Sequence, residues 1–299
     1  MKHSSDKPLV SIITPSYNQG RFIEETIQSV LTQDYPYIEY IVVDGGSTDN
    51  TLEVLKKYGD RLKWISEPDK GQSDAINKGF AMAKGEILAW LNSDDIYLPE
   101  AVSRAVDFFC SFPNTGVVYG KAYYTDISGK VIGNYPTGPF DHKRLAVTNF
   151  ICQPATFFRK QALGRVGGMD VNLHYSMDYD LWIRLSKEYA FGYVEEFLAA
   201  YRLHEDSKTV SPVHSFANHK ECLDVVMRHY DWAPANRVYV YCHSLVITNL
   251  PEYIGKFRPL TLLFSWFVFI VLYLKLNRGL KIEDLKMSTP GNIKKLFKG

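Results

Sequence analysis

Short apolar runs alternate with amphipathic segments over the first 95 residues of the chain. The apolar runs, at 10–14, 40–43, 62–65 and 86–91, have the length and composition of buried strands. The segments between them, 22–31, 47–58 and 72–84, carry apolar residues three and four positions apart, which predicts helices. This order predicts an α/β fold with a mostly parallel, doubly wound sheet and flanking helices.

Clusters of polar residues follow the predicted strands at the point where each strand ends, at 15–18, 44–47, 67–72 and 92–95. Ligands of doubly wound sheets bind beyond the carboxyl ends of the strands. Helix capping alone does not account for polar groups at four such ends, so we expect a ligand site along this edge. The chain has no G-x-G-x-x-G and no P-loop pattern, so neither a usual dinucleotide site nor a P-loop is indicated.

Two adjacent carboxylates, Asp94 and Asp95, stand at the end of the apolar run 86–91. Unpaired charge is costly to bury, and such groups are usually paired or bind a cation. Oxygen ligands suit Mg²⁺ or Mn²⁺, which commonly bridge to substrate phosphates. The alternative is a strand-to-helix turn in which an aspartate caps the helix that would begin near Pro99.

The alternation weakens beyond Pro99. Residues 117–124, with a turn at 128–129, predict a hairpin, and the Gly- and Pro-rich segment 133–145 predicts a loop. Further strands are expected at 153–159, 191–194 and 198–203, and helices at 178–189 and 214–229.

Composition places the chain among globular proteins, with 46% hydrophobic residues and a net charge of +1, so no general affinity for nucleic acid is indicated. Its four cysteines form no C-x-x-C pattern, and we interpret them as reduced thiols of a cytosolic protein. The polar residues 1–8 lack an apolar signal core, so export is not expected.

The C-terminal segment differs from the rest, because residues 252–299 carry a net charge of +6 and residues 1–251 a net charge of −5. This segment contains the apolar run 260–274, flanked by lysine and arginine and shorter than the roughly 20 residues of a spanning helix. Basic flanks with Trp and Tyr favour a membrane interface, which we expect over 256–281. A true span and a helix packed on the protein or on an oligomer partner remain alternatives. We expect a catalytic domain over 1–235 and a helical extension over 236–299.

Five ordered motifs, PSYN (15–18), DGGSTDNT (44–51), EPDKGQSDAINKG (67–79), LNSDD (91–95) and MDYDLWIRL (177–185), resemble those of family 2 glycosyltransferases. The resemblance covers residues 8–210 and implies a GT-A type, Rossmann-like fold. It further implies an inverting, Mn²⁺- or Mg²⁺-dependent transferase that uses a nucleoside-diphosphate sugar, expected to be a UDP-sugar. The expected acceptor is a glycan or lipid-linked glycan, as in bacterial surface polysaccharide synthesis at the cytoplasmic face of the inner membrane.

The same resemblance assigns roles to individual residues. It implies Asp178 as the catalytic base, and Asp94 with His204 as metal ligands. The donor-binding residues it implies are Pro15, Ser16, Tyr17, Asn18, Asp44, Asp69, Gly71, Gln72, Asp74, Asn92, Ser93, Asp94, Asp95 and Arg202. The chain departs from the family where Asn92 replaces the first aspartate of the metal motif and Met177 replaces a common acidic residue. Asp180, about 200° around the helix from Asp178, should face elsewhere.

Two other functions remain open. A sugar nucleotidyltransferase usually has a Gly- and Lys/Arg-rich loop after its first strand, where this chain has residues 15–18. A non-catalytic scaffold that binds nucleotide-sugar would not need all of Asp44, Asp94 and Asp178, which this chain retains. Hydrolysis of the donor is expected only as a side reaction.

Overall fold

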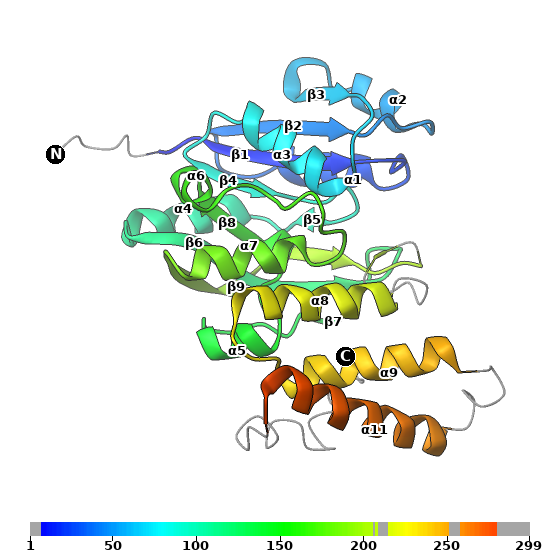
Figure 1. Ribbon diagram of the computed structural model, residues 1–299. Coiled ribbons are helices and arrows are strands. Elements are labelled where there is room, and N and C mark those ends of the chain that lie inside the picture. The colour runs from blue at the N-terminus through cyan, green and yellow to red at the C-terminus, as the bar shows by residue number, and fades with distance from the viewer. Residues whose placement is uncertain (1–6, 206, 209–214, 251–257, 280–299) are drawn as a thin grey trace. The chain divides into compact units, whose positions relative to one another are not determined.

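A computed structural model describes residues 7–205, 207–208, 215–250 and 258–279, and the chain divides into two compact units (Figure 1). Unit 1 comprises residues up to Leu145 together with Asn149–His204, and unit 2 comprises Ala146–Thr148 and the residues from Glu205 onward. The main boundary between the two units therefore follows residue 204, whereas the sequence pattern predicts a domain boundary at 235.

Unit 1 is built on one sheet with the order β3-β2-β1-β4-β8-β6-β9-β5, and β7 pairs with β6. Its strands are β1 (Val10–Ser16), β2 (Ile38–Asp44), β3 (Lys63–Ser66), β4 (Ile87–Trp90), β5 (Ile96–Tyr97), β6 (Thr115–Thr125), β7 (Val131–Asn134), β8 (Thr156–Arg159) and β9 (Ala190–Arg202). The first four strands pair in parallel, as predicted, and β6 is parallel to β9. Strand β8 is antiparallel to both β4 and β6, and β5 is antiparallel to β9, so the sheet is mixed beyond β4.

The helices of unit 1 are α1 (Ile23–Leu31), α2 (Thr51–Lys56), α3 (Gln72–Met82), α4 (Ala101–Ser111), α6 (Lys160–Val166) and α7 (Met177–Ser186). A further helix, α5 (His142–Val147), begins in unit 1, and its last two residues are counted with unit 2. Successive residues of β1 face opposite sides of the sheet, and both sides are covered. Ile12 belongs to a core that includes Ile23 and Ile27 of α1, whereas Ile13 lies against Gly79 of α3. Burial on both faces explains why β1 is a continuous apolar run.

Three details differ from the sequence predictions. The predicted loop 133–145 contains the end of β7 and most of α5. The two strands predicted at 191–194 and 198–203 are one strand, β9, because pairing with β6 continues past the exposed residues Glu195 and Glu196. Helix α4 follows Pro99 with Val102, Val106 and Phe109 buried, a helical spacing that the predictions did not use.

Unit 2 contains α8 (Ser215–His229), α9 (Ala235–Asn249) and α11 (Arg258–Asn277), which share one apolar cluster. Leu223 of α8, Tyr239 and Cys242 of α9, and Phe269 of α11 belong to this cluster. The 19 residues Pro259–Asn277 are long and apolar enough to cross a membrane by length and composition, whereas the sequence pattern predicts a shorter run ending at 274. The helix continues because no Gly or Pro follows before Gly279.

Candidate active site

The polar clusters predicted at the strand ends form a continuous rim in unit 1. The ends of β1 and β2 are level, since Ser16 pairs with Asp44 and the N–H of Gly45 donates to the carbonyl of Ser16 at 2.8 Å. The end of β3 is level with them, because Asp44 also pairs with Ser66. The carboxyl ends of three parallel strands thus meet at one edge, where sequence reasoning placed a ligand site.

The first turn of the rim, which includes Pro15 and Tyr17, is fixed to the second by Asn18. Asn18 has φ 52°, a left-handed conformation that asparagine tolerates. Its Oδ1 accepts a hydrogen bond from the N–H of Thr48 at 2.8 Å, and its own N–H donates to the Ser47 hydroxyl at 2.7 Å. The ring of Tyr17 is 60% exposed and therefore open to a flat ligand beside this turn.

Asp44 holds the second turn together from within. Its Oδ2 accepts hydrogen bonds from the N–H groups of Gly46 and Ser47 and from the hydroxyl of Ser66, and the Ser47 hydroxyl donates to Oδ1. The residue is fully buried. A direct contact of Asp44 with the donor stays a prediction that this geometry does not support.

Asp69 lies directly over Gly45. A side chain at position 45 would place its Cβ 2.7 Å from Oδ2 of Asp69, so glycine provides the space for that carboxylate. Asp69 also accepts a hydrogen bond from the N–H of Gly71 at 2.7 Å. Gly71 has φ 107°, a conformation that L side chains rarely adopt, and it leads directly into α3. Asp69 and Gly71 are therefore placed on the rim, as predicted.

The N-terminus of α3 connects this turn to the next one. The side-chain amide of Gln72 donates to Oδ1 of Asn92 at 2.8 Å. Asp74 accepts from the N–H of Lys70 at 3.1 Å and forms an ion pair with Lys78. The N–H groups of a helix N-terminus favour an anion such as a phosphate, and α3 presents that end at the rim.

Helix α3 also fixes the segment that leads into α7. The hydroxyl of Ser73 donates to the carbonyl of Leu173, and the side chain of Asn77 both donates to the carbonyl of Met169 and accepts from its N–H. These contacts bring residues 169–173 against the helix that borders the rim.

Residues Asn92 to Asp95 alternate between the rim and the interior. Asn92 and Asp94 are partly exposed, whereas Ser93 and Asp95 are buried. Residues 92–95 form a turn, closed by the N–H of Asp95, which donates to the carbonyl of Asn92 at 3.1 Å. The positions that match the two ends of the family's metal motif, Asn92 and Asp94, are therefore the two that face outward.

Asp94 and His204 come together although 110 positions separate them in the chain. Oδ2 of Asp94 lies 3.0 Å from Nε2 of His204, whose side chain is 3% exposed and packs on the ring of Phe22. Two atoms that bind one ion at right angles, each about 2.1 Å from it, are about 3 Å apart. The pair thus fits two adjacent positions of a divalent cation. The described residues contain no group of three or more His, Cys, Asp or Glu for a metal, so water and donor phosphates would supply the other ligands.

Asp95 and Arg202 stabilise this turn from the inside. Asp95 accepts hydrogen bonds from the N–H of Arg202 at 2.9 Å and from the amide of Asn92 at 3.2 Å. Burial, and then the charge of Asp94, raises the pKa of Asp95 well above its ordinary value. Asp95 is fully buried and both of its oxygens already accept hydrogen bonds, so it is the weaker candidate ligand.

The guanidinium of Arg202 is already occupied. It donates to the carbonyls of Asp94 and Ile127, both at 2.9 Å, and forms an ion pair with Glu25. The predicted phosphate contact of Arg202, like the predicted donor contact of Asp95, therefore stays without support from the geometry.

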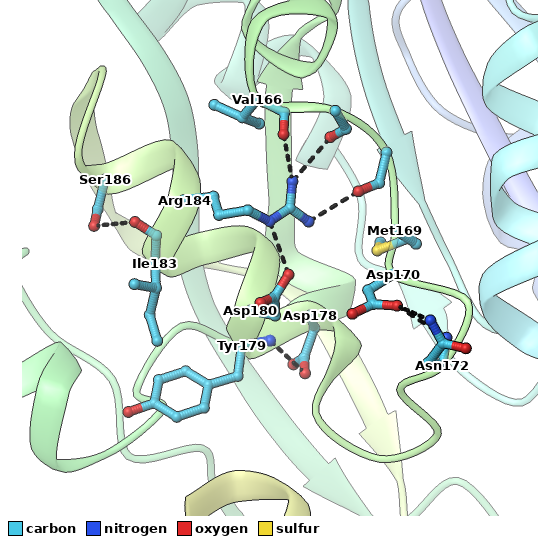
Figure 2. Close-up of polar contacts among 12 residues, drawn as sticks. Val166, Met169, Asp170, Asn172, Asp178, Tyr179, Asp180, Ile183, Arg184 and Ser186 are labelled. Atoms are coloured by element: carbon cyan, nitrogen blue, oxygen red, sulfur yellow. Dashed lines mark hydrogen bonds and ion pairs between the residues drawn. The ribbon is translucent and has the colours of Figure 1, made fainter. Parts of the chain in front are cut away.

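Asp178 occupies the first turn of α7 (Figure 2). Its Oδ2 accepts a hydrogen bond from the side-chain amide of Asn149 at 3.0 Å, and its Oδ1 accepts from the N–H of Tyr179. Asp180 points instead to Arg184, which also donates to the carbonyls of residues 166–168 (Figure 2). Asp180 thus faces elsewhere, as expected, and helps to fix α7 in place.

Cys152 is a fully buried cysteine of unit 1. Burial raises the pKa of its thiol well above the ordinary value, and the charges of Asp95 and Asp178 raise it further. Both carboxylates are therefore within electrostatic reach of one buried atom. Sequence reasoning missed Asn149 and Cys152, and no motif or spacing marks either of them.

Comparison with known proteins agrees with this geometry. A model of glycosyl transferase family 2 matches residues 11–167. An uncharacterized glycosyltransferase of Rickettsia typhi is 30% identical over 223 residues, which cover 70% of this chain and 68% of that protein. The chondroitin synthase of Escherichia coli is 28% identical over 206 residues, 68% of this chain and only 30% of the synthase.

Two solved structures share the fold. TarS of S. aureus in complex with UDP-GlcNAc has a TM-score of 0.60 at 18% identity and covers 89% of this chain and 81% of its own. The mannosyltransferase PcManGT of Pyrobaculum calidifontis in complex with GDP-Man and Mn²⁺ has a TM-score of 0.61 at 17% identity, with 97% and 81% covered. The family match over more than half of the chain, the relative from Rickettsia typhi and this shared GT-A fold show that the chain belongs to glycosyltransferase family 2.

Proposed function

We propose that this glycosyltransferase transfers a sugar, with inversion, from a nucleoside-diphosphate sugar to a hydroxyl group of a glycan or lipid-linked acceptor. One observation carries the proposal: unit 1 contains Asp94, paired with His204 at the rim, and a second carboxylate, Asp178, which begins α7 and is held by Asn149. The first pair suits a cation that binds the diphosphate, and the second suits a base. All of these residues lie in unit 1, to which we assign catalysis.

The donor would lie along the rim from the turn at 15–18 to Asp94. The exposed Tyr17 and the carboxylate of Asp69 border the side proposed for the base and ribose. The diphosphate would lie near Gln72, at the N-terminus of α3. We propose a UDP-sugar, a choice supported by the likeness to TarS, whose structure contains UDP-GlcNAc. PcManGT, which binds GDP-Man, supports only the broader class of nucleotide-sugars.

Asp94 and His204 would hold Mn²⁺ or Mg²⁺, which supplies charge neutralisation for the diphosphate leaving group. Asp178 would accept the proton of the acceptor hydroxyl while that oxygen attacks the anomeric carbon. The attack comes from the face opposite the leaving group, which inverts the configuration. The amide of Asn149 holds the carboxylate in one orientation for this step.

The likeness to a chondroitin synthase supports a glycan acceptor, although the chain covers less than a third of that synthase. We propose bacterial surface polysaccharide synthesis at the cytoplasmic face of the inner membrane as the setting. The apolar helix α11 supports this location, because a lipid-linked acceptor would be available there.

The proposal is tested by calorimetric titration with UDP-, GDP- and dTDP-sugars, with and without Mn²⁺. Tight binding of one donor that requires Mn²⁺ is expected, and Asp94→Ala should abolish the metal-dependent part. Asp178→Asn should retain donor binding and lose transfer by about 100-fold or more, since a general base contributes that much. The exposed residue Asp60 provides a control, because Asp60→Asn should change neither quantity.

Four results would contradict the proposal or one of its parts. A folded protein that binds none of these nucleotides is not a nucleotide-sugar transferase. Binding without transfer to any acceptor would favour the scaffold, and diphosphate release from a nucleoside triphosphate and a sugar phosphate would favour the nucleotidyltransferase. Normal transfer by Asp178→Asn would exclude Asp178 as the base.

A further inference from the structure

Helix α11 exposes a wide apolar face and buries a narrow one. The exposed side chains include Leu263, Phe264, Phe267, Ile270, Val271 and Leu274, which are 39% to 68% exposed. The buried stripe consists of Thr261, Ser265, Phe269 and Tyr273, four positions apart and at most 3% exposed. An exposed apolar face of this kind marks an interaction surface.

The buried stripe is held by α9, which runs antiparallel to α11 within unit 2 (Figure 1). Nδ1 of His243 lies 2.9 Å from the hydroxyl of Ser265. At the other end the side chain of Asn277 bonds both the N–H and the carbonyl of Ala233, at 2.9 and 3.0 Å. From Ser265 to Asn277 the two helices are thus paired over about 18 Å, at 1.5 Å per residue.

This pairing argues against a helix that crosses a bilayer. If α11 crossed, α9 would lie in the hydrocarbon beside it, with the partly buried imidazole of His243. Helix α8 packs on α9 through Leu223 and through the stacking of Phe216 on Tyr241. It would therefore be drawn into the hydrocarbon together with α9. Helix α8 carries the exposed ion pair of Lys220 and Asp224, and charged groups are costly within a membrane.

The charges around α11 indicate which surface covers it. No acidic residue occurs from 258 to 282, and lysine or arginine lies at both ends of the helix, at 256 and 258 and at 275 and 278. Two copies packed face to face, parallel or antiparallel, would bring these cationic ends together. An anionic lipid surface instead attracts both ends at once.

We propose that α11 lies in the plane of an anionic bilayer, with its exposed apolar face in one leaflet and α9 on its water side. This geometry is that of an interfacial helix, whose apolar face enters about 5 to 10 Å below the headgroups. The inference goes beyond the transfer reaction and does not depend on it, because every contact that supports it lies in unit 2.

Trp266 distinguishes the two orientations, because it is 36% exposed and lies near the middle of the helix. In a spanning helix its indole would sit at the bilayer centre, whereas in an in-plane helix it would sit just below the headgroups. In the experiment, full-length protein is added to vesicles of phosphatidylcholine that contain about 30% phosphatidylglycerol, which supplies the anionic surface. Quenching of tryptophan fluorescence is compared between lipids brominated near the headgroup and lipids brominated near the chain ends. The signal of the Trp266→Phe variant is subtracted, so that the difference reports Trp266 alone.

Stronger quenching by the shallow bromines is expected, together with weaker binding to pure phosphatidylcholine and at high salt. Leu263→Glu and Phe267→Glu should each lower the vesicle partition coefficient by about tenfold or more, because a charge replaces an inserted apolar group. Ile132→Glu is the matched control, since Ile132 is 56% exposed in unit 1 and should leave binding unchanged.

The other outcomes each overturn the proposal. Strongest quenching by the deep bromines would show a spanning helix. A dimer in light scattering that Phe267→Glu dissociates, without binding to vesicles, would show that a second copy covers this face. Unchanged binding of both glutamate variants would place the lipid contact elsewhere.

Discussion

Asp94 and Asp95 are neighbours in the chain, yet the structure gives them different environments. Asp94 is partly exposed beside His204, whereas Asp95 is buried and accepts the backbone N–H of Arg202. The turn at 92–95 leaves the carboxylate of Asp94 at the rim and directs that of Asp95 into the interior, where it supports the turn. Asp178 and Asp180 of α7 also have different environments, because Asn149 donates to Asp178 and Arg184 donates to Asp180. Residues two positions apart on a helix do not face the same side.

Asn149 is predicted to orient the proposed base. Its amide donates to Asp178, and a donated hydrogen bond favours the charged form of a carboxylate. Asn149→Ala should therefore raise the pKa of that carboxyl and move the acid limb of the kcat profile to higher pH. It should lower kcat by about tenfold, while donor affinity stays unchanged.

The measurement is kcat against pH, with calorimetric donor affinity measured in parallel. Asn172→Ala is the control, because Asn172 is an exposed asparagine bonded to Asp170 (Figure 2). A purely structural role for Asn149 would lower activity equally at every pH, and that result would contradict the prediction.

Helix α3 connects the core of unit 1 to the candidate site. Gly79 brings the helix close to β1, since a Cβ there would lie 2.4 Å from Cγ2 of the buried Ile13. At its other end Gln72 bonds Asn92, so the approach of α3 to the sheet sets the position of its N-terminus on the rim. A single glycine thus influences both packing and the site.

Substitution of Gly79 should therefore destabilise the protein. Gly79→Ala gains up to about 1 kcal/mol of helix propensity but loses about 1 to 3 kcal/mol by overpacking against Ile13. The control is Gly164→Ala in α6, where a Cβ would meet no atom within 4 Å, so a gain of about 0.5 to 1 kcal/mol is expected. Urea denaturation of both variants measures the two free energies, and the same sign for both would contradict this account.

Two compact units, each with a core of its own, make up the described part of the chain. Every residue of the candidate site lies in unit 1, and every contact that supports the membrane inference lies in unit 2. The two activities proposed here are therefore separable at the scale of the whole molecule, and ligands should act on the units differently.

Differential scanning calorimetry should resolve two unfolding transitions. Donor with Mn²⁺ should raise the midpoint temperature of the unit 1 transition only. A donor at 100 times its Kd stabilises the unit that binds it by about 2.7 kcal/mol, and a chelator should remove most of that gain. A single transition, or an equal shift of both, would show that the units unfold together. A shift that persists with chelator would contradict the metal dependence.

The alternation of strands and helices in the first 95 residues and the polar clusters at the strand ends follow from the sequence, because apolar runs and turn residues are local signals. The direction of β8 and the continuity of β9 do not follow from it, because they depend on pairing partners far away in the chain. The apolar spacing of the sequence also marks helix α4, which the predictions named only as an alternative near Pro99, and the full length of α11, which they shortened.

The sequence by itself determined the family, since five motifs in a fixed order are specific, and it identified Asp94, His204 and Asp178 as candidates. Only the tertiary structure decided which groups are available. It paired Asp94 with His204, brought Asn149 to Asp178, and occupied Asp44 and Arg202 with internal bonds. The physical reason is that hydrogen bonding and burial are properties of neighbours in space, and residues 94 and 204 become neighbours only when β9 joins the sheet.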